Sequence, residues 1–131
     1  MIQIRYSSPN QLEISGNIDG LQTVQQALLN LARSRSSAIT EIFADPVSDP
    51  TPYVHALLKL TIQVGQGPTT IAVPENESVL IMGSPDNLER LASFFDFSLN
   101  ESTGAHAHYE YHEGNPYIAP NAIPLVISLQ G

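Results

Sequence analysis

The chain has 131 residues, of which 42% are hydrophobic, and a formal net charge of −8 at pH 7. A chain of this length fits one domain that buries about two-thirds of its surface without a disulfide or a metal. The hydrophobic fraction is too high for a disordered acidic tail. The absence of cysteine excludes disulfide scaffolds, thiol nucleophiles and cysteine-based metal sites. We therefore expect a compact, acidic, cytoplasmic protein.

The charge balance also argues against two classes of partner. Five lysine and arginine residues stand against thirteen aspartate and glutamate residues, so the surface lacks the cations that displace counterions from nucleic acid. An anionic membrane would repel it, and no stretch of the sequence approaches the roughly 18 apolar residues of a membrane helix. Residues 1–6 alternate polar and apolar side chains, which predicts a strand and not a signal peptide. We expect neither nucleic-acid nor membrane binding.

The first predicted elements are a hairpin and a helix. Residues 2–6 and 11–15 alternate in polarity around a turn-forming cluster, which predicts two strands. Asn17 is a suitable N-cap for the helix that follows. Four apolar residues recur at helical spacing behind this cap: Leu21, Val24, Leu28 and Leu31. The helix should end near Arg33 and Arg35, because cations suit its C-terminal dipole.

The first half then ends in two predicted strands. Residues 38–44 are rich in β-branched and aromatic side chains, and residues 54–64 hold a further strand. Between them, residues 45–52 contain three prolines. Proline cannot donate a hydrogen bond to a neighbouring strand, so we expect this loop to lie outside the sheet.

The second half has the same predicted order of elements. Residues 69–73 and 78–82 are apolar strands, and Ser84 with the following Pro85 marks a helix start. The buried face of this helix is expected to contain Leu88, Leu91, Ala92 and Phe95. Residues 105–112 alternate as a strand, and residues 123–129 form the final strand.

The two halves resemble each other in sequence as well as in element order. An offset of 67 residues places Ile4 on Ile71, Ile14 on Ile81, Gly16 on Gly83 and Asp19 on Asp86 without a gap. Later the offset is 64, and Pro52-Tyr53 meets Pro116-Tyr117. We interpret this pattern as an internal duplication with halves 1–66 and 67–131. The junction at 65–68 is short, which favours one compact domain in which the halves pack together.

One helix for every four strands is typical of the α+β class. We expect two pseudo-repeated β-β-α-β-β units that form one or two antiparallel sheets, with both helices packed on one face. The other sheet face must then be covered by a loop, by the sister half or by a partner chain. Homodimerisation is one way to cover it.

The most conspicuous polar cluster lies in the strand predicted over 105–112. Alternate side chains of a strand share a face. One face of this strand therefore carries His106, His108, Glu110 and His112, and Glu113 follows directly. The opposite face carries Ala107, Tyr109 and Tyr111, which we expect to point into the core.

Three interpretations of this histidine row stay open. It is a solvent-exposed polar row, a partner-binding surface, or a metal or catalytic site centred on His106, His108 and His112. Imidazole and carboxylate groups ligate Zn, Fe, Ni and Mn. Same-face residues of one strand are about 6.5–7 Å apart, however, so at most two neighbours reach one ion. Further ligands, such as His55, would have to come from elsewhere. No catalytic residue and no cofactor is predicted.

The order of motifs resembles the immunity protein 32 family of bacterial polymorphic toxin systems. The matching features are a strand that ends in glycine and leads into a helix, a His-x-His strand, and an apolar C-terminal strand. In this chain they correspond to residues 12–31 or equally 79–95, then His106-Ala107-His108, and then 123–129. The resemblance implies a non-enzymatic protein that binds and neutralises a cognate toxin.

The charge is distributed unevenly between the halves. Residues 1–67 hold four basic and five acidic residues, a net charge of −1, whereas residues 68–131 hold one basic and eight acidic residues, a net charge of −7. An acidic surface speeds association with a basic partner. We therefore expect Glu110 and Glu113 to contribute to a surface for a basic toxin. The alternatives are a metal-dependent enzyme or metal-binding protein, and a homo-oligomeric structural module.

Overall fold

The computed structural model describes residues 1–34, 37–46, 49–98 and 100–130. These residues form two α-helices, two short 3-10 helices and nine strands, which confirms the predicted α+β class. The strands are β1 (Ile2–Ser7), β2 (Gln11–Gly16), β3 (Ile39–Phe43), β4 (His55–Leu57), β5 (Lys59–Val64), β6 (Thr70–Ala72), β7 (Ser78–Gly83), β8 (His106–Tyr109) and β9 (Leu125–Leu129). The helices are α1 (Ile18–Ala32), α2 (Pro85–Ala92), η1 (Pro74–Asn76) and η2 (Ser93–Phe95).

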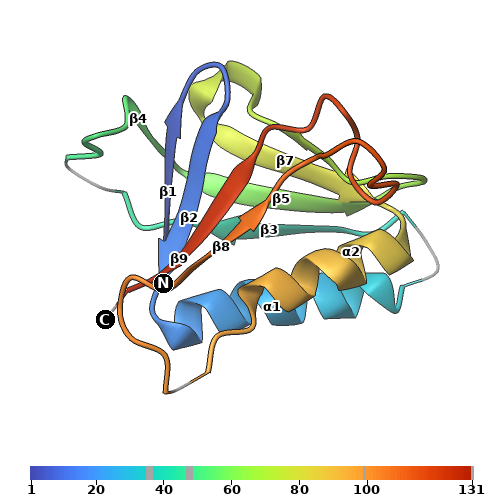
Figure 1. Cartoon of the computed structure of the whole chain (residues 1–131), viewed down its shortest axis with the longest axis horizontal. Helices are drawn as coiled ribbons and strands as arrows, with labels where there is room; N and C mark the ends of the chain where they lie inside the picture. Colours follow the sequence, from blue (N-terminus) through green and yellow to red (C-terminus); the bar gives the residue numbers. More distant parts are fainter. Residues whose placement is uncertain (35–36, 47–48, 99, 131) are drawn as a thin grey trace.

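The strands form two sheets. Sheet A has the order β4-β1-β2-β9-β8, and sheet B has the order β3-β5-β7-β6. Figure 1 shows β1, β2 and β9 of sheet A running across β3, β5 and β7 of sheet B, with α1 and α2 together on one side. No helix in the described ranges is long and apolar enough to cross a membrane.

The two halves exchange hairpins. The β1–β2 hairpin of the first half pairs through β2 with β9 of the second half, which in turn pairs with β8. The β6–β7 hairpin of the second half pairs through β7 with β5 of the first half, which in turn pairs with β3. The strand registers correspond in the two sheets. Ile14 lies opposite Ile4 and Ile127, and its counterpart Ile81 lies opposite Ile71 and Ile62. Neither half therefore builds a sheet from its own strands alone. The internal duplication in sequence stays a prediction.

The expectation of purely antiparallel sheets needs correction at one pair in each sheet. β2 runs parallel to β9, and β5 runs parallel to β7, while the other strand pairs are antiparallel. The reason is the exchange. Strands joined by a tight turn must be antiparallel, but each central pair brings together strands from different halves, and no short connection dictates their direction.

The helix starts follow the sequence prediction. Asn17 caps α1 by accepting a hydrogen bond from the Gly20 amide at 2.8 Å, and Ser84 caps α2 by accepting one from the Asn87 amide at 3.4 Å. The C-cap of α1 is Arg33. Arg35, the second cation expected at this helix end, lies outside the described residues.

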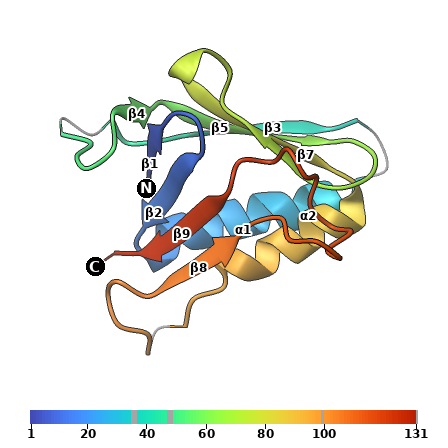
Figure 2. The same ribbon diagram turned by 45° about the horizontal axis from the view of Figure 1, so that its top comes forward.

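The core lies between the inner faces of the two sheets and the paired helices. Helix residues such as Leu28 and Leu91 and strand residues such as Ile14 and Ile81 are fully buried and belong to one hydrophobic cluster. Figure 2 shows α1 and α2 side by side on one side of the sheets. The outer faces of both sheets are consequently left for solvent or for partners.

Two predicted strands are shorter than the alternation suggests. The strand expected over 54–64 is divided at Leu58, because β4 pairs with β1 in sheet A whereas β5 joins sheet B. The strand expected over 105–112 ends at Tyr109, which is buried as predicted. Tyr111 lies beyond this end and is 38% exposed, so its expected place in the core is wrong.

Candidate functional site

The outer face of sheet A is the polar surface from which the site is built. Alternate residues of β1, β2, β8 and β9 point away from the core because strand side chains alternate between faces. These outward residues include Gln3, Arg5, Glu13, Val126, Ser128, His106 and His108. They derive from both halves of the chain, since β2 and β9 are neighbours.

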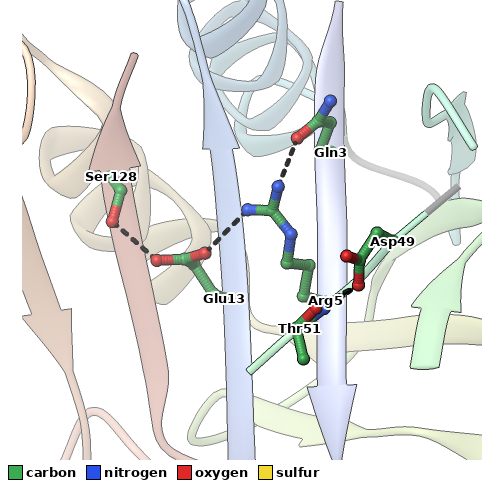
Figure 3. A network of polar contacts seen from close by, with 6 residues as sticks. All are labelled: Gln3, Arg5, Glu13, Asp49, Thr51 and Ser128. Carbon is green, nitrogen blue, oxygen red and sulfur yellow. Dashed lines mark hydrogen bonds and ion pairs between the residues drawn. The ribbon is translucent and has the colours of Figure 1, made fainter. Parts of the chain in front are cut away.

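An ion pair and two hydrogen bonds connect the three inner strands of this face (Figure 3). Arg5 Nη1 lies 3.2 Å from Glu13 Oε1, and Arg5 Nη2 donates to Gln3 Oε1 at 2.8 Å. Ser128 Oγ on β9 donates to the other Glu13 oxygen at 3.0 Å. The Arg5 and Glu13 side chains are only 17% and 18% exposed, so each charge depends on its partner. This network makes a neutral, ordered floor for the face.

The loop that ends in Tyr53 lies against this floor. Figure 3 shows Asp49 and Thr51 beside Arg5. Thr51 donates two hydrogen bonds to Asp49 Oδ1, one from its hydroxyl and one from its amide, and these bonds lower the pKa of Asp49. Burial and then the nearby Glu13 carboxylate raise the pKa of Tyr53. The Val54 amide donates to Ser7 Oγ at 3.0 Å, which ties the loop to β1.

A cavity of about 560 Å³ opens where this loop meets the β1–β2 turn and the end of β8. Its lining residues are Asn10, Gln11, Leu12, Pro52, Tyr53, His108, Glu110, Pro124 and Val126. The lining thus combines apolar walls with one carboxylate, one imidazole and one phenol. The first half contributes five of these residues and the second half four.

The structure places only part of the predicted histidine row at this cavity. His106 and His108 lie on β8 and are exposed, with ring centroids 5.0 Å apart in an edge-to-face arrangement. His108 and Glu110 line the cavity. His112 and Glu113 lie in the turn beyond β8, where the His112 carbonyl accepts a hydrogen bond from the Asn115 amide. The row is therefore interrupted because the strand ends before Glu110.

The described residues hold no group of three or more histidine, aspartate or glutamate side chains placed to bind a metal. The early end of β8 separates His112 from His106 and His108. His55, the further ligand considered from sequence, lies on β4, and three strands separate β4 from β8 across sheet A. This geometry gives no support to the metal-site interpretation of the row.

Sequence reasoning missed the first-half residues of this site. Arg5 and Glu13 lie opposite each other in the hairpin register, and a count outward from the turn at 7–10 could have paired them. Tyr53 belongs to the repeated Pro-Tyr pair, which marked it as unusual without indicating its position. Its approach to His108 and Glu110 depends on the hairpin exchange, for which the sequence pattern carries no signal.

The family model of immunity protein 32 matches residues 78–130. This range runs from β7 through α2 and β8 to the end of β9, and it includes the four second-half residues of the cavity. The resemblance found in the sequence is confirmed for this range. No curated protein and no solved structure matches the chain.

Proposed function

We propose that this chain binds a protein toxin and neutralises it in the cytoplasm without catalysis. The match of residues 78–130 to the immunity protein 32 model is the observation that carries the proposal. An immunity protein of this kind acts by occupying or blocking its toxin, so it needs a stable complementary surface and no reactive group.

The outer face of sheet A, at its β8 edge, is the surface we assign to the toxin. His106, His108 and Glu110 are exposed there, and they belong to the range that matches the family. In the neighbouring network, Arg5 and Ser128 both contact the Glu13 carboxylate, and these contacts link β1, β2 and β9 side by side. A face linked in this way, with exposed polar groups at its edge, loses little conformational entropy when a partner binds.

The charge of the second half supports a basic toxin as the partner. Residues 68–131 carry a net charge of −7, and Glu110 and Glu113 both lie in exposed positions beyond β8. Long-range attraction from such a surface raises the association rate and is screened by salt. The association rate with the toxin should therefore fall steeply as ionic strength rises.

A growth assay tests this function. Any toxin-like domain encoded by a gene adjacent to that of this chain is expressed alone and together with the chain. We expect growth only when both are present, and co-purification of the two proteins. The Glu110→Lys variant should lose protection, whereas Glu77→Lys, the same charge change at an exposed residue that does not line the cavity, should retain it. Failure of the wild-type chain to protect against the adjacent toxin refutes the proposal.

An exposed apolar edge strand supports homodimer formation in addition to toxin binding. Ile39 and Phe43 on β3, an edge strand of sheet B, are 58% and 66% exposed. An apolar edge strand offers both unpaired backbone groups and apolar area to a second copy. Light scattering is expected to give the mass of a dimer, and Phe43→Lys should shift it to a monomer. A wild-type monomer at all accessible concentrations contradicts the homodimer.

A further inference from the structure

We propose that the cavity on sheet A receives one lysine or arginine side chain of the protein partner. This inference rests on the proposed function, because it names the chemistry by which the same surface recognises its partner. The cavity would serve as the central anchor of the interface, and the net negative charge of the second half would guide the partner toward it.

The charge inside the cavity is the first reason. Glu110 is the one formally charged residue among those that line it. Within the described part of the chain, the Glu110 carboxylate makes no hydrogen bond and no ion pair, whereas the Glu13 carboxylate on β2 is paired with Arg5 and Ser128. An unpaired carboxylate in a partly enclosed site favours a cation and repels an anion. The unpaired Glu110 carboxylate therefore favours a positively charged ligand.

The walls supply the second reason. Pro52, Pro124 and Val126 form an apolar surface, and the half-buried Tyr53 lines the same space. Lysine and arginine carry an aliphatic stem below a charged head, and the stem packs on apolar surface while the head seeks a carboxylate or an aromatic face. A compact metal ion would leave these apolar walls unused. A neutral apolar ligand would leave Glu110 buried and unpaired.

The chain itself contains an example of the proposed contact. The Arg90 guanidinium carbon lies 3.9 Å from the centroid of the Tyr117 ring. Tyr117 belongs to the second Pro-Tyr pair, and Tyr53 belongs to the first. No described lysine or arginine stacks on the Tyr53 ring, so this ring is available to a cation from outside.

A titration of the full chain with small probes tests the inference without any toxin. The probe is N-acetyl-arginine-N-methylamide, and the control probe is the norleucine analogue, which has a stem of similar length and no charge. Two-dimensional amide NMR should show shifts that cluster around Leu12, Tyr53 and Glu110 for the arginine probe only. Equal binding of both probes, shifts elsewhere, or no shift at any probe concentration overturns the inference.

Three variants sharpen the titration. Glu110→Gln should weaken the arginine probe about tenfold, since a charge-assisted bond is lost. Tyr53→Leu should weaken it about threefold through loss of the ring. Glu77→Gln, which removes the same charge away from the cavity, should leave the affinity unchanged. An affinity that falls equally in Glu77→Gln and Glu110→Gln would show general charge attraction and would overturn the assigned site.

The two proposals fail in different ways. If the chain binds the arginine probe in the cavity but does not protect cells from the adjacent toxin, the proposed function is wrong and the cation site remains. If the chain protects cells but the cavity does not bind the probe, this inference is wrong and the proposed function remains.

Discussion

Replacement of Ile81 by alanine tests whether the two halves share one core. Ile81 is fully buried at the centre of sheet B, between Ile62 on β5 and Ile71 on β6. The substitution removes three buried carbons, each worth about 0.8 kcal/mol of transfer free energy. The cavity left behind adds to this loss, and the total should reach about 3–4 kcal/mol. Such a change is a large part of the stability of a domain this size.

Urea unfolding followed by circular dichroism measures this loss. The midpoint should fall while the slope stays unchanged, because the surface exposed on unfolding is the same. Leu80→Ala is the matched control, since Leu80 lies on the same strand but on the half-exposed outer face. We expect it to cost about 1 kcal/mol or less. Equal losses in the two variants would contradict the assigned faces of β7.

The hairpin exchange extends the prediction to the other half. Ile14 on β2 is the counterpart of Ile81 and is also fully buried. Ile14→Ala and Ile81→Ala should each lower the urea midpoint of a single unfolding transition shared by both halves. The reason is that each central strand pairs with a strand from the other half. Two separate transitions, or hydrogen-exchange protection that persists around Ile14 in unfolded Ile81→Ala, would refute the shared core.

Three further outcomes are expected. Cleavage of a protease site introduced at 65–68 should leave the halves associated in size-exclusion chromatography, because both sheets contain strands from both halves; native separation would contradict the exchange. Asn17→Ala should cost about 1 kcal/mol in urea unfolding through loss of the α1 cap, and unchanged stability would show that the cap contributes nothing. Burial raises the pKa of Tyr109, with the Thr69 hydroxyl acting in the opposite direction. The folded state therefore keeps a proton that the unfolded chain loses, and stability should fall as the pH rises above about 10. Tyr109→Phe should reduce this loss of stability at high pH. At neutral pH the substitution should change the free energy of unfolding little, since the hydroxyl has no hydrogen-bond partner of normal geometry in the described chain. A loss of stability at high pH equal to that of the wild type would contradict this reasoning.

Local features of the fold were predictable because they depend on neighbouring residues. Alternation located β1 and β2 within a residue of their ends, and the helix starts at Asn17 and Ser84 followed from capping chemistry. The histidine row was harder to predict. Alternation continues to His112, but the backbone leaves the sheet after Tyr109 and the pattern has no means to show this.

The sequence by itself determined the class of the fold, the helix caps, the buried stripes and the acidic character of the second half. These properties arise from side-chain chemistry and from periods of two or 3.6 residues, which act over a few neighbours. Only the tertiary structure decided that β2 lies parallel to β9 and that Tyr53 and Glu110 line one cavity. Contacts of this kind join residues far apart in the chain. Several alternative strand pairings would bury the same apolar residues, so the local sequence pattern does not distinguish between them. The choice among them is made by the packing of both sheets against one pair of helices.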